Sequence, residues 1–186
     1  MQSTIGARDP SACAKGNTVV AVPIAPHAVA AVLPLAESAA TFGFPCIVVL
    51  PFEQLRLPGG QSQTARVLAL PPPDPPLLPR GFWCNKPAAD YTRRRLQYHR
   101  MRLWHVLLER GLDVLGIDSG MRLRRDPLPA IGAMRTREDE QYGKGVRPDV
   151  LGGTPGWFLK EFYLHTLWIR STPTTRALLA LSLIHI

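Results

Sequence analysis

Three short runs rich in Val, Ile and Leu constrain the fold of this chain most strongly. They comprise residues 18–22, 46–50 and 113–117, and segments with helical periodicity separate them. Parallel neighbours in a sheet need a long right-handed crossover, for which a helix is the usual connection. The pattern therefore predicts an α/β fold with a mostly parallel sheet flanked by helices, in which these three runs are neighbouring strands.

Two segments between these runs have the apolar spacing of helices. Residues 27–42 follow a turn expected at residues 23–26, contain a Pro that predicts a kink or a late start of the helix, and end at Gly43. Residues 90–110 form the strongest predicted helix, with Gly111 as its C-terminal cap. The apolar face of this second helix is predicted to consist of Leu96, Leu103, Trp104, Leu107 and Leu108.

The remaining segments are predicted to be less regular. We expect residues 1–17 to be disordered, and we expect a Pro-rich irregular connection over residues 57–82. Residues 130–148 lack a clear period, and residues 138–140 are interpreted as a surface turn. Large apolar residues then alternate over residues 158–170.

Composition indicates one globular domain and leaves the partner open. The chain has 186 residues, a hydrophobic fraction of 46% and a net charge of +8. A basic protein attracts anions such as nucleic acid. The charge comes from 18 Arg and only 4 Lys spread along the chain. Such a bias also follows from a coding sequence rich in G and C, so the charge is weak evidence for a nucleic-acid partner.

Cysteine usage and apolar segments give little information about the compartment. Cys13, Cys46 and Cys84 are far apart and form no Cys-x-x-Cys pair, so the spacing predicts neither a zinc site nor a disulfide scaffold. The first 17 residues lack the apolar core of a signal peptide. Interruptions by Pro and Glu leave no apolar stretch in the sequence that is long enough to cross a membrane.

The block of residues 111–129, GLDVLGIDSGMRLRRDPLP, contains the main candidate site. Asp118 stands where the predicted strand ends, and open α/β sheets bind ligands beyond the carboxyl ends of their strands. A carboxylate there can hold a divalent cation that in turn binds phosphate oxygens. Positive charge follows at Arg122, Arg124 and Arg125, and Asp126 with the next Pro is interpreted as a stop.

This block and its neighbours resemble the metal-binding core of nucleotide-diphospho-sugar transferases. The resemblance consists of a basic helix, Gly-hydrophobic-Asp-Val-Leu, a motif similar to Asp-x-Asp, a basic stretch and Asp-Pro-Leu-Pro. The most similar family is that of retaining glycosyltransferases, which includes plant and algal arabinosyl- and xylosyltransferases. The order of elements agrees with this family over residues 18–180, which we interpret as a partial transferase domain.

The resemblance implies a GT-A-like, Rossmann-like sheet and a metal-dependent reaction. A sugar would pass from a nucleotide-diphosphate donor to a glycan or glycoprotein acceptor, with Mn²⁺ or Mg²⁺ neutralising the departing diphosphate. Arg100 would contact donor phosphates, and Asp118 would bind the metal. The resemblance also implies the Golgi lumen as the location. It identifies no catalytic base. The alternative is a basic module that binds nucleic acid or another polyanion through residues 93–102, without catalysis.

Two departures from the family pattern affect the expected activity. Gly120 replaces the second aspartate of the Asp-x-Asp motif, whose two carboxylates would face the same side of a strand end. Tyr163 and His165 occupy the positions of a usual Asn-x-Gly. The first departure predicts weak metal binding and little or no turnover, and the second lies at an expected sugar-binding place. Asp118, Gly120 and Arg100 are the expected donor-binding positions.

The last six residues suggest an origin outside the coding sequence. Residues 181–186, LSLIHI, are what a transposase-type sequencing adaptor encodes, so we expect authentic sequence to end near Ala180. We expect this tail to contribute little to stability. A short apolar C-terminal strand is the alternative interpretation.

Overall fold

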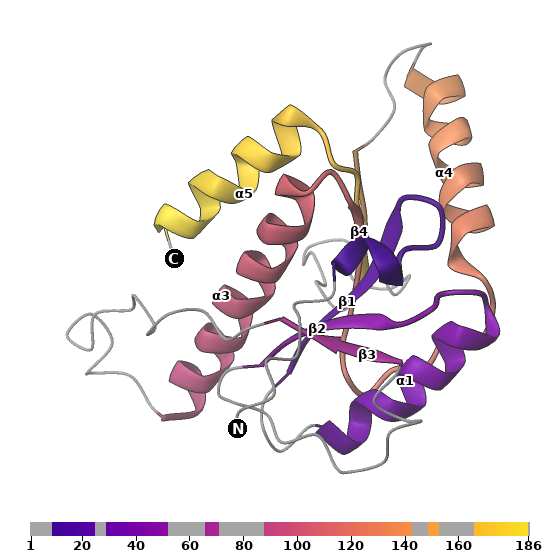
Figure 1. Ribbon diagram of the computed structural model, residues 1–186. Coiled ribbons are helices and arrows are strands. Elements are labelled where there is room, and N and C mark those ends of the chain that lie inside the picture. Colours follow the sequence, from indigo (N-terminus) through magenta and orange to yellow (C-terminus); the bar gives the residue numbers. More distant parts are fainter. Residues whose placement is uncertain are drawn as a thin grey trace.

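The computed structural model describes residues 9–24, 29–51, 66–70, 88–142, 149–152 and 166–185. These residues form one mixed sheet with helices on both faces (Figure 1). In chain order the elements are η1 (Pro10–Cys13), β1 (Thr18–Ile24), α1 (Val29–Thr41), β2 (Ile47–Pro51), β3 (Val67–Ala69), α3 (Ala88–Glu109), β4 (Asp113–Ile117), α4 (Pro127–Tyr142), β5 (Val150–Gly152), β6 (Thr166–Ile169) and α5 (Pro173–His185).

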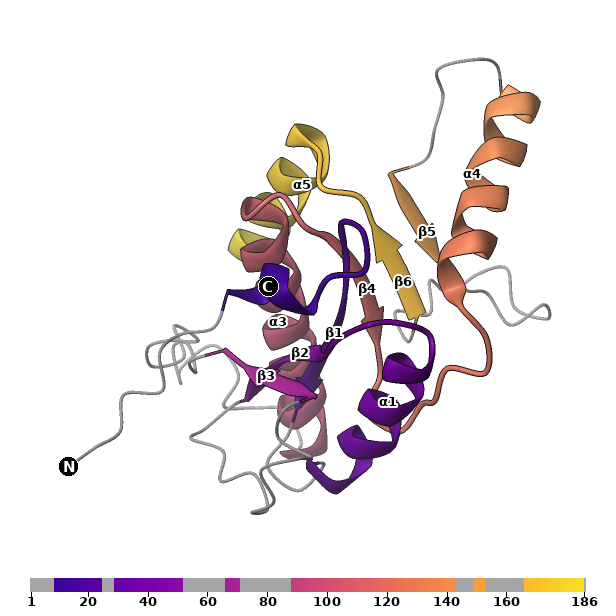
Figure 2. The ribbon, with the colours of Figure 1, turned by 45° about the vertical axis from the view of Figure 1, so that its right-hand side comes forward.

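The sheet has six described strands in the order β3-β2-β1-β4-β6-β5. β1, β2, β3 and β4 are parallel, whereas β6 is antiparallel to both of its neighbours (Figure 2). The prediction that the runs at 18–22, 46–50 and 113–117 are neighbouring strands is confirmed, with β1 between the other two. This part of the sheet has the strand order of a Rossmann-like half.

The central strand β1 is buried along its whole length because helices cover both faces of the sheet. Val20, Val22 and Ile24 pack into a core with α1 and α4. Val19 and Ala21 point to the other face and pack into a second core with α3 and α5. This alternation explains why β1 has no polar position apart from its first residue, and it confirms the expectation of a buried strand.

The largest difference from expectation is α4, because residues 130–148 were expected to lack regular structure. Asp126 is the N-terminal cap of this helix: its Oδ1 accepts a hydrogen bond from the Leu128 amide at 3.1 Å. Pro127 is the first helical residue, a position that tolerates Pro because its amide would have no partner there. Asp-Pro therefore starts a helix here and does not stop a chain segment. Residues 138–140, expected as a turn, lie inside this helix.

β1 extends beyond the predicted boundary into the expected turn. Pro23 and Ile24 continue the strand and pair with Leu50 and Pro51 of β2. The pairing with β4 ends at Ala21, so Pro23 lies where β1 has only one strand neighbour. A strand position with one neighbour tolerates the missing amide of Pro.

Two segments expected to be irregular contain regular structure. Residues 9–17, within the predicted disordered segment, include η1 and a two-residue bridge between Lys15 and Thr18. β3 lies within the predicted Pro-rich connection and pairs with β2. The rest of that connection lies outside the described residues.

The C-terminal residues continue a helix, so the alternative of a C-terminal strand is wrong. α5 begins after Thr172 and continues to His185. Leu179 is buried, whereas Leu181 is 57% exposed. Among the residues that the structure describes, no helix combines the length and the apolar character needed to cross a membrane.

Candidate functional site

The candidate site lies where the direction of chain progression across the sheet reverses. From β1 the chain passes through α1 to β2 and β3 on one side, and α3 then brings it back to β4 on the other side of β1. In open α/β sheets the crevice outside the carboxyl ends of two such strands is where ligands bind. β1 and β4 end at Ile24 and Ile117, toward the lower side of Figure 1.

Asp118 directly follows β4 at this switch point. Its side chain is 27% exposed, so it is reachable from solvent. The carbonyl of Asp118 accepts a hydrogen bond from the Met121 amide at 3.1 Å, which closes a turn over Ser119 and Gly120. Residues 118–120 therefore lie past the strand ladder, and strand alternation does not determine how positions 118 and 120 face each other.

Arg100 comes from α3, which lies against the sheet, and its guanidinium binds Asp118. Nη2 of Arg100 donates a hydrogen bond to Oδ1 of Asp118. The Arg100 side chain is only 7% exposed. Burial lowers the pKa of Arg100 because the charged form loses hydration, and the Asp118 carboxylate opposes this shift. The structure thus brings together two residues that sequence analysis selected separately.

The ion pair has two consequences for the chemistry of the site. A buried guanidinium without a carboxylate partner would cost free energy. The two residues therefore hold each other in place at the carboxyl end of β4. The pair also neutralises the charge of Asp118, which lowers the attraction of this carboxylate for a cation. A ligand that uses either residue has to compete with the other one.

Gly120 is the position where the family pattern has a second aspartate, and there is room for one. Gly120 is exposed, and a Cβ added there would have no heavy atom within 4 Å. Its φ is outside the positive range that side chains avoid, so the backbone accepts a larger residue.

The basic segment after Asp118 runs away from the switch point. The Leu123 amide donates a hydrogen bond to Oγ of Ser38, near the C-terminal end of α1, at 3.0 Å. Oδ2 of Asp126 lies 2.5 Å from Nζ of Lys15, which precedes the amino end of β1. A five-residue strand is about 17 Å long. Arg124 and Arg125, next to Asp126, therefore lie toward the opposite end of the sheet from Asp118.

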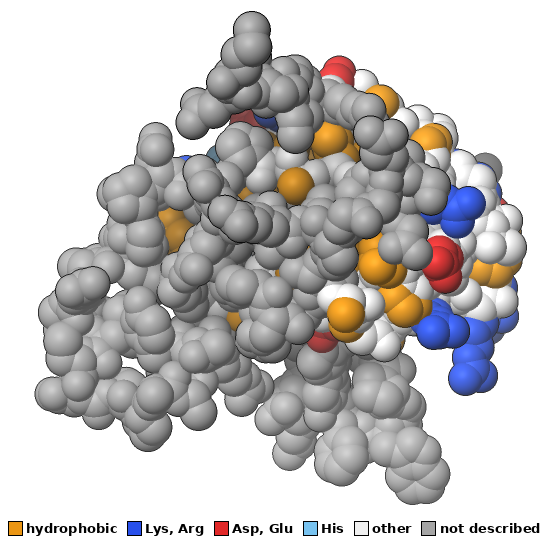
Figure 3. Space-filling model, turned by 60° about the horizontal axis from the view of Figure 1, so that its bottom comes forward, with side chains coloured by type: hydrophobic (Ala, Val, Ile, Leu, Met, Phe, Trp, Pro, Cys, Tyr) orange, Lys and Arg blue, Asp and Glu red, His pale blue; other side chains and the backbone are white. Residues whose placement is uncertain are grey.

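Figure 3 turns the lower side of Figure 1 forward, which is the side of the carboxyl ends. Its described part shows Lys and Arg side chains next to hydrophobic ones (Figure 3). Among the three arginines of this segment, Arg122 is the nearest in the chain to Asp118, and its side chain is exposed. We therefore limit the expected phosphate contacts of the basic segment to Arg122.

Asp118 is the described carboxylate of this site that could hold a metal ion. Asp118 supplies one carboxylate, and Arg100 already binds one of its oxygens. Within the described ranges, no group of three or more His, Cys, Asp or Glu side chains is placed to hold a metal. A cation at Asp118 would therefore take most of its oxygen ligands from phosphate and water, as Mg²⁺ commonly does.

The basic helix α3 is a poor fit to a nucleic-acid surface over the part whose side chains are described. Tyr98, Arg100 and Trp104 are buried, and α5 packs against α3 (Figure 1). Arg102 is half-buried, and its Nη1 lies 3.4 Å from the Tyr98 hydroxyl. The side chains of residues 93–95 lie outside the described set.

Two further polar or covalent links were not found by sequence reasoning. The first is the ion pair of Lys15 and Asp126, in which Lys15 Nζ also donates to the Phe42 carbonyl at 2.7 Å. The hydrogen bond from Lys15 lowers the pKa of Asp126. The second is a disulfide between Cys13 and Cys46. Neither link has a sequence signal, because each joins residues that are distant in the chain.

No protein-family model matches this chain, and a search of curated proteins gives no match. The expectation of a nucleotide-sugar site therefore depends on the block of residues 111–129 and on its position at the switch point. Tyr163 and His165, the second departure from the family pattern, lie outside the described residues.

Proposed function

We propose that this chain carries the donor-binding part of a glycosyltransferase with a GT-A-like sheet. Its reaction would transfer a sugar from a nucleotide-diphosphate donor to a glycan or glycoprotein acceptor. The single observation that supports this proposal best is the position of Asp118 directly after β4, beside β1, at the switch point of the sheet. This is where a carboxylate that serves a phosphate-bearing ligand is expected.

Each residue of the site has a separate role in this proposal. Asp118 would hold Mn²⁺ or Mg²⁺, which when bound neutralises the negative charge of the diphosphate leaving group. Arg100 positions Asp118 through their hydrogen bond, and its guanidinium would donate to a phosphate oxygen in competition with Asp118. Arg122 is exposed in the segment that follows and adds positive charge.

The same geometry predicts low activity for this sequence. Asp118 is the only carboxylate in the 118–120 turn, and its charge is balanced by Arg100. A diphosphate with its cation would therefore bind weakly, and turnover would be slow. The physical reason for the weak binding is that Gly120 replaces the second aspartate.

Paramagnetic line broadening tests the proposal because it detects weak binding and reports its position. Mn²⁺ would be added to the isotope-labelled chain together with uridine, guanosine or cytidine diphosphate. We expect broadening of backbone amide signals around residues 117–121, dependent on the presence of both metal and diphosphate. Asp118→Asn should abolish this broadening.

Asp149→Asn is a matched control for that substitution. Asp149 also lies beside an arginine, at 3.9 Å from Arg170, and its side chain is 31% exposed. It directly precedes β5. The strand register places it level with the beginning of β4, whereas Asp118 follows the end of β4. The control should keep the broadening. Equal broadening in the Asp118→Asn variant would contradict the proposal.

The alternative of a basic module that binds nucleic acid gives a different result in a simple titration. Binding of a fluorescent single-stranded RNA would need no metal, and its affinity would fall steeply with salt. The burial of Arg100 and Trp104 favours the transferase proposal over this alternative. Metal-independent, salt-sensitive binding of RNA with no response to diphosphate would reverse that preference.

A further inference from the structure

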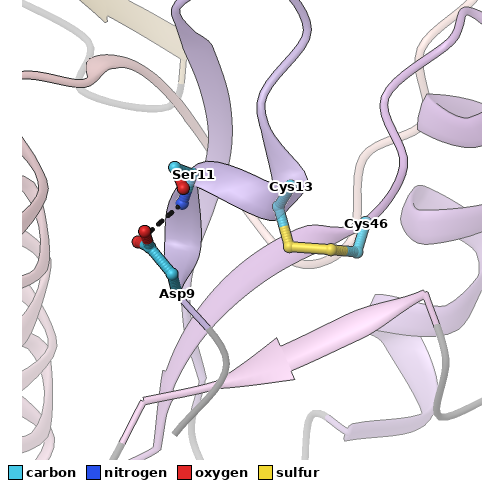
Figure 4. The surroundings of a disulfide bond; sticks show 4 residues. All are labelled: Asp9, Ser11, Cys13 and Cys46. Carbon is cyan, nitrogen blue, oxygen red and sulfur yellow. Dashed lines mark hydrogen bonds between the residues drawn. A yellow bond between two sulfur atoms is a disulfide. The ribbon is translucent and has the colours of Figure 1, made fainter.

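A disulfide attaches the first described segment to the sheet. Cys13 is the last residue of η1, and Cys46 directly precedes β2, with their Cα atoms 4.6 Å apart (Figure 4). The two residues are 33 positions apart in the sequence. At the start of η1, Oδ1 of Asp9 accepts a hydrogen bond from the Ser11 amide at 3.1 Å and caps the short helix (Figure 4).

The disulfide is part of the hydrophobic core. Cys13 is fully buried and belongs to the core between the sheet and α3, together with Val19, Val48 and Leu103. Cys46 is partly buried and packs against the same cluster. η1 itself has four residues, of which only Pro10 and Cys13 are buried. One 3₁₀ turn with two buried side chains has little to hold it in place without a covalent link.

The segment between η1 and β1 contacts three other parts of the fold. Lys15 and Thr18 exchange backbone hydrogen bonds of 2.9 and 3.1 Å around a turn at Gly16, whose φ is +62°. Asn17 accepts a hydrogen bond from the first amide of β4, and its Nδ2 donates to the Gly111 carbonyl at 2.9 Å. Lys15 reaches Asp126 at the start of α4. Displacement of η1 would disturb all of these contacts.

We propose that the Cys13–Cys46 disulfide is a redox-dependent link that keeps residues 9–17 docked on the sheet, and that this chain reaches its fold in an oxidising compartment. Disulfides of this kind persist in secretory and other oxidising compartments and are rare where glutathione keeps thiols reduced. This inference does not depend on the proposed transferase function. It rests on the pairing, on the burial of Cys13 and on the contacts of residues 15–17.

The redox step is balanced by an ordinary thiol–disulfide exchange. The two thiols of Cys13 and Cys46 lose two protons and two electrons to a small-molecule disulfide, such as glutathione disulfide, through a mixed disulfide. The products are the protein disulfide and two molecules of reduced thiol. A dithiol such as dithiothreitol reverses the step and becomes a cyclic disulfide.

The first experiment identifies the pairing chemically. The full chain is refolded in a glutathione redox buffer, alkylated without reduction and digested for mass spectrometry. We expect a linked peptide that contains Cys13 and Cys46, and an alkylated Cys84. A link from Cys84 to either partner, or three alkylated cysteines, would overturn the proposal.

The second experiment measures what the link contributes. Dithiothreitol should lower the melting temperature of the wild-type chain by roughly 10 °C, because a closed loop of about 30 residues constrains the unfolded chain. The double variant Cys13→Ala with Cys46→Ala should melt lower even without reductant, and Cys84→Ser is the control that should not. The wild-type comparison needs no substitution, so it remains decisive if the double variant does not fold.

Hydrogen exchange separates a local undocking from a general loss of stability. On reduction, the amides of residues 11–18 should exchange much faster, whereas the amides of β4 and β6 should change less. A melting temperature unaffected by dithiothreitol, with unchanged exchange at residues 11–18, would overturn the proposal.

Discussion

The indole of Trp104 in α3 lies directly against the backbone of Gly116 in β4. A Cβ added to Gly116 would be 2.7 Å from Nε1 of Trp104, closer than such atoms approach in proteins. Trp104 is 1% exposed, so it cannot move out into solvent without opening the core. The close approach of α3 and β4 at this point also supports the position of Asp118, two residues further along the chain.

Gly116→Ala should therefore destabilise the fold by about 1–3 kcal/mol, because a methyl group would overpack the core at Trp104. Urea unfolding followed by circular dichroism measures this change. Gly132→Ala is the matched control: Gly132 lies in α4, where an added Cβ meets no atom within 4 Å. That control should be neutral or stabilising, since Ala favours helix over Gly.

A second substitution tests whether Trp104 causes the loss of stability in Gly116→Ala. Replacing Trp104 by Phe removes ring atoms next to Gly116, so the added methyl group should cost less in the Phe background than in the wild type. Equal costs in the two backgrounds would show that the indole is not what restricts residue 116.

Asp118→Asn should destabilise the fold by about 1–3 kcal/mol, because Arg100 would keep its buried charge without a carboxylate. Replacing both residues, as Arg100→Met with Asp118→Asn, should recover part of this loss, since no buried charge remains. A double-mutant cycle from urea unfolding gives the coupling.

Asp149→Asn again serves as the control. Its ionic partner Arg170 is 46% exposed and 3.9 Å away, and an Asn oxygen still accepts the hydrogen bond from Thr172, so the substitution should cost less than about 1 kcal/mol. If the Asp118 and Asp149 variants lose the same free energy of unfolding, the burial of Arg100 does not make its pair with Asp118 more stabilising than an exposed pair.

The ion pair of Lys15 and Asp126 predicts a pH dependence of stability. The pKa of Asp126 is lowered in the folded state, first by the hydrogen bond from Lys15. A carboxyl with a lowered folded pKa stabilises the fold above its unfolded pKa of about 3.9, and this stability is lost as the pH falls through the folded pKa. The free energy of unfolding of the wild type should therefore exceed that of Asp126→Asn at neutral pH, and the difference should shrink below about pH 4.

Asn keeps the capping acceptor at the start of α4, so this comparison isolates the charge. Urea midpoints at several pH values for both proteins provide the measurement. A difference that stays constant between neutral and acidic pH would mean that the charge of Asp126 does not stabilise the fold.

Local patterns predicted the sheet centre well because its strands are apolar on both faces. β4 has the predicted bounds, and β1 and β2 differ from the prediction only at their ends. The failure at α4 has a local cause: Asp126 and Pro127 are signals that either stop a segment or start a helix, and the weakly amphipathic residues after them did not distinguish the two. η1 could not be predicted, because its burial depends on Cys13 and its distant partner.

The candidate site was predictable in its members but not in its contacts. Sequence patterns selected Arg100 and Asp118 for different roles, and only the crossover through α3 shows that they bind each other. The path of the chain after Asp118 could not be predicted from the sequence either. It depends on contacts with Ser38 and Lys15, which are distant in the chain.

The last prediction concerns Gly120, at the exposed end of the turn that Asp118 begins. An aspartate there would add a second carboxylate within two residues of Asp118, and the open space around Gly120 can accommodate it. Arg100 already pairs with Asp118, so an added aspartate would bring one further negative charge and a second carboxylate ligand for a divalent cation. Gly120→Asp should therefore bind Mn²⁺ with a nucleoside diphosphate at least tenfold more tightly than the wild type, which corresponds to about 1.4 kcal/mol.

Calorimetric titration of Mn²⁺ with uridine diphosphate into each protein measures this gain. Gly120→Asn has nearly the same shape without the charge and should behave as the wild type does. Gly132→Asp adds the same charge in α4, where the added side chain also has open space, and it should not improve binding. A gain in both aspartate variants would assign the effect to net charge. Wild-type binding as tight as that of Gly120→Asp would mean that the second carboxylate is not what the site lacks, and the assignment of Asp118 as the metal ligand would be wrong.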